Sequence, residues 1–271
     1  MTKKILAINL TLYLWYHNHQ MMSAPLKLKL DPDQKFTLTG EIKAEDVRSA
    51  YQKNLVHHQQ HLKLDGFRPG KVPLNLVTQN TDPQELLEET INESVSQIYQ
   101  LSLDHHQLKP IIPPQVSFLS TKFELDKDWP LEITSCLVPK IELKPTLYSL
   151  IAKLDSKLEL KAKTEKVISL LEKSTKITVP QILLDYEFSR QKPDSKKPTP
   201  QDKAEFEAKL TNEWAVNLAI NQIATNEKIS VSPEEMKAVI SQNPSLSQNP
   251  NLVYYLLLQQ KAIDFLLAKI S

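Results

Sequence analysis

Glycine is scarce in this chain, and its scarcity limits where the backbone can turn tightly. Only three of the 271 residues are glycine, and two of them, Gly66 and Gly70, lie four positions apart. Glycine adopts positive φ without strain, so it is the usual residue of tight turns. The chain also has eighteen prolines, many of them at expected helix starts or in linkers. We therefore expect a helix-rich chain with stiff connections and one tight loop at residues 66–70.

The side chains of this loop suit an anionic surface. Phe67 and Arg68 lie between the two glycines, and Lys71 follows directly. Arginine can pair with phosphate and stack flat, an aromatic ring can stack on a base or anchor on an apolar surface, and lysine adds a point charge. The sequence therefore predicts a loop that holds these three side chains at its tip for binding.

Composition excludes several classes of protein. The net charge is +1, so a nucleic-acid contact has to be local rather than spread over a basic face. A single cysteine, Cys136, excludes an intramolecular disulfide and a cysteine-based zinc site, and suits a reducing cytosol. We expect it to be a small buried residue in a strand. The chain contains no run of about 20 apolar residues, so no membrane-spanning helix is expected.

The first half of the chain alternates between strand and helix patterns. Alternating apolar residues predict a β-hairpin from residues 26–30 and 36–42. Helical spacing begins at Ala44, a short helix is expected over 72–77, and a long one after the capping sequence Asp82-Pro83-Gln84-Glu85. Two more strands are expected over 115–123 and 131–143. This order predicts an α+β domain, an antiparallel sheet packed with helices.

The second half is helical in pattern. An amphipathic helix is expected over 150–173, and another after the extended residues 177–180. Residues 192–200 have the composition of a linker. Further helices are expected to begin at Thr199-Pro200, Ser232-Pro233 and Asn249-Pro250. We expect an all-α domain.

The glycine-containing loop carries a resemblance to a known family. The pattern Gly-Phe-Arg-x-Gly-Lys-x-Pro resembles the ribosome-docking signature of trigger factor, the bacterial chaperone of the tunnel exit, and its residues here are Gly66-Phe67-Arg68-Pro69-Gly70-Lys71-Val72-Pro73. The resemblance implies that residues 66–71 bind the ribosome, with Phe67, Arg68 and Lys71 as the contacts. The family usually has a basic residue at the loop centre, where this chain has Pro69. That proline removes one charge, stiffens the tip and puts docking strength in question.

The order of elements resembles trigger factor as well. The implied organisation is an N-terminal extension (1–25), a ribosome-binding domain (26–147) and a helical C-terminal chaperone domain of the trigger factor or SurA-like type (148–271). Most trigger factors carry a peptidyl-prolyl isomerase domain between the two. That domain is β-rich with glycine-rich turns, and no glycine follows Gly70. We therefore expect no isomerase domain and no isomerase activity.

The resemblance implies a cytoplasmic chaperone that binds nascent, unfolded chains and docks on rRNA and a ribosomal protein. Its client surface would be apolar residues of the C-terminal domain, such as some of those in Leu256–Leu258 and Phe265–Leu267, with a further client surface under the N-terminal domain as an option. One alternative is an exported SurA-like chaperone with residues 1–22 as a signal peptide, and another is a ribosome-binding adaptor without chaperone activity. For residues 1–25 we favour an N-terminal extension, which could arise from an upstream start codon if translation normally begins at Met21 or Met22. A third alternative is an extra strand or helix at the edge of the domain.

Other chemistry is not indicated by the sequence. His57 and His61 could share a helix face, but a metal site needs three or four converging ligands, so a solvated helix face is favoured. Glycine-rich phosphate loops, Gly-x-Ser-x-Gly and His-Glu-x-x-His are absent. The lysine-rich segment 153–166 also carries acidic residues and indicates a solvated helix. No enzyme activity, metal or cofactor is expected.

Overall fold

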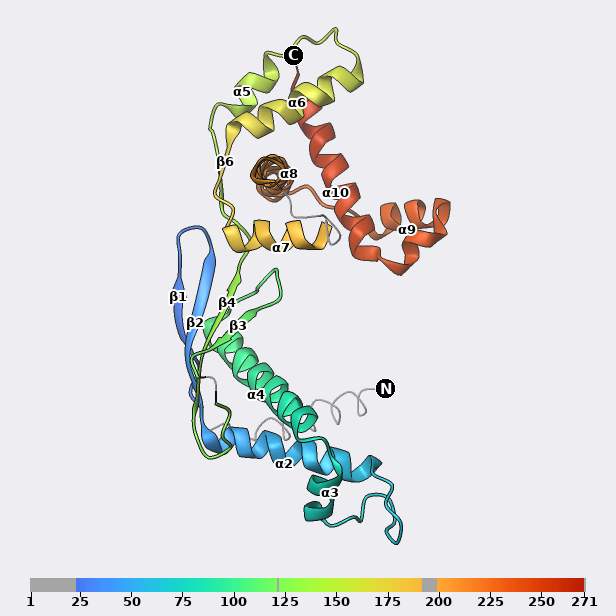
Figure 1. Cartoon of the computed structure of the whole chain (residues 1–271). Helices are drawn as coiled ribbons and strands as arrows, with labels where there is room; N and C mark the ends of the chain where they lie inside the picture. Colours follow the sequence, from blue (N-terminus) through green and yellow to red (C-terminus); the bar gives the residue numbers. More distant parts are fainter. Residues whose placement is uncertain (1–22, 121, 192–198, 271) are drawn as a thin grey trace. The chain divides into compact units, whose positions relative to one another are not determined.

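The computed structural model describes residues 23–120, 122–191 and 199–270, which form two compact units (Figure 1). The division falls between Leu137 and Val138. Unit 1 is the part before this division and unit 2 the part after it. Most of the predicted extension, 1–25, and of the predicted linker, 192–200, lies outside the described residues.

Unit 1 is an antiparallel sheet with helices. Its elements are β1 (Lys27–Leu30), β2 (Lys35–Ile42), α2 (Ala44–His61), α3 (Leu74–Asn80), α4 (Pro83–His106), β3 (Gln115–Phe118) and β4 (Trp129–Cys136). The strand order is β1-β2-β4-β3, and every neighbouring pair is antiparallel. The predicted β1–β2 hairpin is confirmed, with Lys27 opposite Thr39. The α+β class is therefore confirmed for this unit.

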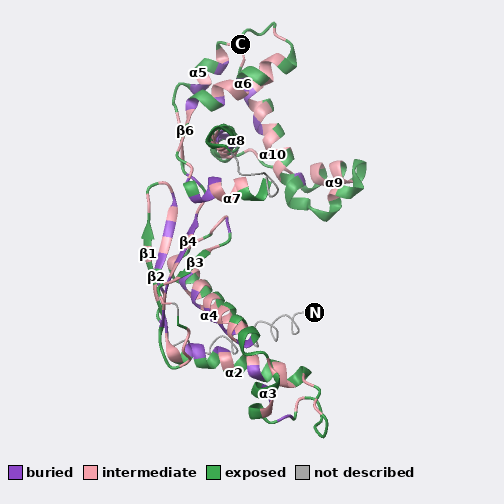
Figure 2. Ribbon diagram, viewed as in Figure 1, coloured by how far each residue is buried: buried purple, intermediate pink, exposed green. Residues whose placement is uncertain are grey.

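One face of the sheet is buried and the other is polar. Strand alternation places every second residue of β2 and β4 on the buried face, including Phe36, Leu38, Ile42, Leu131 and Ile133. Ile98 of α4 belongs to the same core, and Figure 2 shows the buried stretches on both strands. Cys136, at the end of β4, is buried as predicted, and burial raises the pKa of its thiol to about 11. The buried face holds the sheet on the helices.

Trp129 links the sheet to the loop that follows β3. Its side chain is buried, and its ring meets Phe118 and Phe123 edge to face at centroid distances of 6.3 and 5.3 Å. Its indole N–H donates to the backbone oxygen of Glu124 at 3.1 Å. This aromatic cluster therefore fixes both the start of β4 and the loop before it.

Asp128 closes the N-terminal end of α2. One carboxylate oxygen accepts from the backbone N–H of Ala44 at 2.8 Å and the other from Lys43 Nζ at 2.8 Å. Lys43 first, and then the Ala44 N–H, hold the pKa of the Asp128 carboxyl below its usual value. A negative charge is favourable at this end of a helix.

We expect Asp128→Asn to lower the free energy of unfolding of unit 1 at neutral pH, with a loss that shrinks in acid. A carboxyl whose pKa is depressed in the folded state stabilises the fold above its unfolded pKa, and that contribution disappears as pH falls through the folded pKa. Urea unfolding of both proteins at several pH values between about 7 and 3 checks this. A difference that stays constant over this range would contradict it.

Unit 2 is mainly helical. Its elements are β5 (Ile141–Leu143), α5 (Leu147–Ala152), α6 (Leu160–Ser174), β6 (Thr175–Ile177), α7 (Gln181–Gln191), α8 (Pro200–Asn226), α9 (Pro233–Gln242), the 3-10 helix η1 (Pro244–Gln248) and α10 (Pro250–Leu267). The predicted helix starts are confirmed, because Thr199 and Ser232 each form a reciprocal capping box, with Asp202 and Glu235. The unit also contains the antiparallel β5–β6 pair, so it is not purely α.

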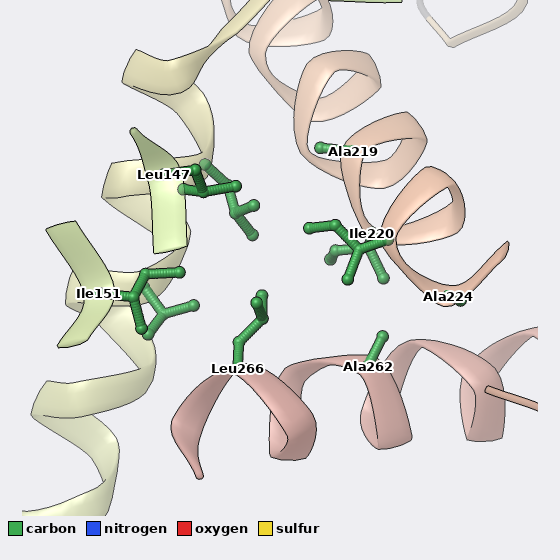
Figure 3. Close-up of a cluster of buried hydrophobic side chains, with 10 residues drawn as sticks. Leu147, Ile151, Ala219, Ile220, Ala224, Ala262 and Leu266 are labelled. Atoms are coloured by element: carbon green, nitrogen blue, oxygen red, sulfur yellow. The ribbon is translucent and has the colours of Figure 1, made fainter. Parts of the chain in front are cut away.

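The core of unit 2 brings together helices that are far apart in sequence. Leu147 and Ile151 of α5 point toward Ile220 of α8 and Leu266 of α10 (Figure 3). Ala219 and other small residues of α8 are also buried, which lets the neighbouring helices approach closely. These contacts make the unit a single packed body with its own core.

The single strand predicted over 131–143 is wrong, because this segment contains two strands, one in each unit. β4 ends at Cys136, and β5 pairs with β6 of unit 2. Pro139 lies between them and lacks the N–H that a continuous strand needs. The division between the units consequently precedes the boundary expected after residue 147. The strand expected over 115–123 likewise ends at Phe118.

Two helices also differ from expectation. The segment predicted as one helix over 150–173 is α5 and α6, separated at residues 153–159, where Asp155 accepts from the backbone N–H of Lys157 at 2.9 Å. Such local bonds of aspartate compete with helix continuation. The helix expected at 72–77 begins at Leu74, and Val72 belongs to the loop.

Candidate functional site

The predicted binding loop connects α2 to α3 and is built from two tight turns. The N–H of Phe67 donates to the oxygen of Leu64 at 3.1 Å, and that of Lys71 to the oxygen of Arg68 at 3.0 Å. Gly66 and Gly70 hold the third position of these turns with φ of 84° and 78°. Positive φ at this position is the mark of a type II turn, and proline is favoured just before it. Pro69 therefore fits the backbone that Gly70 requires.

The base of the loop is tied to the last turns of α2. The N–H of Gly70 donates to the oxygen of Gln59 at 3.1 Å, and the Gln59 side-chain amide donates to the oxygen of Val72 at 2.6 Å. Val72 is completely buried, in a small cluster with Leu55 and Val77. The roles of Gln59 and Val72 in bracing the loop were not predicted from the sequence. The one sequence signal for this brace was Val72 itself, because an apolar residue between Lys71 and Pro73 in a polar loop indicates a buried anchor.

The tip of the loop is exposed. Phe67 has 39% of its surface exposed, and Arg68 and Lys71 are exposed as well. Over the described residues, neither cation has a hydrogen bond or ion pair through its side chain. Figure 1 shows the loop extending beyond the ends of α2 and α3. The structure thus places an exposed aromatic ring and two positive charges, neither of them ion-paired within the described residues, on one braced loop.

The histidines of α2 have different surroundings. The rings of His57 and His61 lie 4.9 Å apart on an exposed face, whereas His58 Nε2 lies 2.7 Å from a Glu89 carboxylate oxygen. In the described parts of the chain, no three histidine, cysteine or acidic side chains converge as metal ligands would.

The apolar residues expected to face clients divide between surface and core. On α10, Leu252, Tyr254 and Leu256 are 40–49% exposed, while Leu266 is fully buried. Phe265 and Leu267 pack against the same core as Leu266. The exposed apolar surface of α10 is therefore confined to its first half. Of the two apolar runs considered for a client surface, residues 265–267 contribute to the core of unit 2, with Phe265 and Leu267 partly buried.

A turn of this sequence could resemble the trigger factor signature by chance, so the rest of the chain must show whether the protein belongs to the family. A family model described as bacterial trigger factor protein (TF) matches residues 26–173, more than half of the chain. The chain belongs to the trigger factor family. The match includes the whole binding loop and extends through α6 of unit 2.

Individual trigger factors match over the first part of the chain. The trigger factor of Granulibacter bethesdensis is 34% identical over 108 residues, which are 39% of this chain and 23% of that protein. The trigger factor of Gluconobacter oxydans is 28% identical over 117 residues, 42% of this chain and 25% of that protein. The chain thus matches about a quarter of the length of these relatives.

A solved structure shares the fold of both units. It comes from work on promiscuous substrate recognition in the folding and assembly activities of the trigger factor chaperone. It covers 91% of this chain and 100% of its own, with a TM-score of 0.61 and 12% sequence identity. At this identity the likeness shows the fold alone.

Proposed function

We propose that this chain is a ribosome-associated chaperone that binds nascent, unfolded polypeptides at the tunnel exit and assists their folding. The observation that carries the proposal is the braced loop, with Phe67, Arg68 and Lys71 at its tip. Arg68 and Lys71 provide charge for rRNA phosphates, and Phe67 provides an apolar or stacking contact for rRNA or a ribosomal protein. Membership of the trigger factor family supports this role.

Co-sedimentation of the full chain with purified ribosomes tests docking. The proposal expects the chain in the ribosomal pellet at low salt and its gradual release as salt increases. Two phosphate contacts give a log–log slope of about −1.5 with salt, because each contact releases roughly one counterion. A chain that stays in the supernatant at every salt concentration contradicts docking.

Client binding is supported by the exposed apolar side chains on the first half of α10 in unit 2. Suppression of aggregation of a chemically unfolded protein tests this part separately. We expect suppression at equimolar chaperone without a nucleotide. A chain that sediments with ribosomes and suppresses no aggregation would be the ribosome-binding adaptor instead.

The proposed chaperone acts without prolyl isomerase activity. Only residues 137–140 connect β4 to β5, so no further domain is inserted where unit 1 meets unit 2. We expect no acceleration of a proline-limited refolding reaction, whose uncatalysed time is tens to hundreds of seconds. Acceleration at catalytic concentrations would contradict this.

We propose that the chain acts in the cytoplasm, where ribosomes are available. Among the helices that the structure describes, none has the length and apolar character needed to cross a bilayer. Mass spectrometry of the native N-terminus distinguishes the alternatives. A chain that begins at Met1, Met21 or Met22 supports a cytoplasmic protein, and cleavage after Ala24 supports the exported chaperone.

Pro69→Lys is expected to tighten ribosome binding up to about tenfold and to steepen its salt dependence by about one counterion. The substitution adds a charge to the exposed tip. Lysine can adopt the backbone of this turn position, although without the preorganisation of proline. Equilibrium binding at several salt concentrations measures both quantities. An unchanged salt slope would show that residue 69 does not face the ribosome.

A further inference from the structure

The sheet of unit 1 has two edge strands, and their chemistry differs. β1 forms one edge and β3 the other. β1 carries Lys27 and Lys29, whereas β3 consists of the uncharged residues Gln115–Phe118. Lysine on an edge strand opposes pairing with another chain, and β3 lacks this protection. Figure 2 shows β3 largely exposed.

The register identifies which backbone groups of β3 face outward. In the register of β3 and β4, Leu119 lies opposite Pro130, and its N–H donates to the Pro130 oxygen at 2.9 Å. Hydrogen-bonded pairs alternate in an antiparallel ladder, so Ser117 and Gln115 also direct their backbone groups to β4. The N–H and C=O groups of Val116 and Phe118 consequently point away from the sheet.

Exposed apolar side chains flank these outward groups on both faces. Val116 is 37% exposed and lies opposite Ile133, on the core-side face of the sheet, while Leu119 is 66% exposed on the other face. Only an extended polypeptide offers donors and acceptors at the spacing of this edge. Side chains of such a strand alternate between the faces, so an apolar segment would cover both Val116 and Leu119.

We propose that the β3 edge binds an extended apolar segment of an unfolded client by strand addition, with Val116 and Phe118 supplying the backbone hydrogen bonds. This inference rests on the proposed chaperone function and adds a client site in unit 1. Hydrogen bonds between backbones do not depend on the side chains of the client, which suits a protein that binds many different unfolded chains.

Val116→Pro is the direct test, because it removes an outward N–H and leaves the ladder to β4 intact. Proline is tolerated at such positions of an edge strand. Val116→Lys is the second variant, and Leu30→Lys on β1 is its matched control. Leu30 is 45% exposed, on the same face of the opposite edge, and its backbone also points outward. Circular dichroism establishes that each variant is folded.

The probe is a fluorescent peptide of alternating valine and threonine with a lysine at each end. We expect both Val116 variants to weaken its binding to the full chain about tenfold or more. Val116→Pro removes a backbone hydrogen bond to the peptide, and Val116→Lys replaces the apolar contact with a charge that opposes strand pairing. Leu30→Lys should change binding less than about twofold. The peptide should also slow hydrogen exchange of the Val116 and Phe118 amides.

Equal peptide binding by wild type and both Val116 variants would overturn the proposal. A wild-type dimer that Val116→Lys converts to monomer would also overturn it, by assigning the edge to a second copy of the chain. Aggregation suppression by the wild type is measured in parallel. If the wild type suppresses aggregation but the Val116 variants bind the peptide as tightly as it does, strand addition is wrong and the chaperone function stands. If the peptide binds through β3 and suppression is absent, the chaperone function fails.

Discussion

Replacing both Phe67 and Arg68 with alanine is expected to abolish co-sedimentation with ribosomes. A hydrogen bond to a charged group contributes about 1.5–3 kcal/mol, and stacking of an aromatic ring on a base about 1–3 kcal/mol. Loss of both should weaken binding at least about a hundredfold. Neither side chain is buried, and Arg68 has no hydrogen bond or ion pair within the described residues. The fold should therefore be unaffected.

The matched control removes two charges from the same unit at a distance from the loop. Lys27→Ala/Lys29→Ala leaves the loop intact and changes the net charge by more than the loop variant does. If docking depends on the loop, this control still sediments with ribosomes. If both double variants lose binding equally, overall charge rather than the loop governs docking, and the proposed site is wrong.

Trp129→Ala is expected to lower the free energy of unfolding of unit 1 by about 3–5 kcal/mol. The side chain is 1% exposed, packs edge to face on Phe118 and Phe123, and donates to the Glu124 carbonyl. Alanine leaves a large cavity in this aromatic cluster. Urea unfolding followed by circular dichroism measures the loss.

Trp129→Phe supplies the comparison for this prediction. Phenylalanine keeps most of the apolar contact and lacks the indole N–H, so its cost should be clearly smaller than that of alanine. The packing account fails if alanine costs less than about 1 kcal/mol, or if phenylalanine is as destabilising as alanine.

The binding loop could be predicted from sequence because its signals are local. Two glycines in a glycine-poor chain marked the turns, and the structure gives both residues positive φ. The helix starts at Thr199 and Ser232 were equally local, because a capping box is complete within four residues. The brace from Gln59 to Val72 was missed because it joins a helix to a loop thirteen positions later.

The end of the sheet could not be predicted, because it depends on pairing between distant segments. Residues 141–143 alternate as a strand should, yet their partner is residues 175–177 of unit 2. Periodicity predicts a strand without indicating which strand lies beside it. The same limit applies to α10, where Leu256 and Leu266 belong to similar apolar runs, but only Leu266 meets α5 and α8 in the core.

Site-specific crosslinking tests the central claim, docking through the loop tip, most directly. A photoreactive phenylalanine analogue replaces Phe67 in one protein and Tyr254 in another. Tyr254 is a suitable control because it is also aromatic, is 40% exposed and lies on α10 of unit 2. On illumination with purified ribosomes, position 67 should crosslink to rRNA or a ribosomal protein and position 254 should not. The absence of an adduct from position 67, or equal adducts from both positions, would contradict the claim.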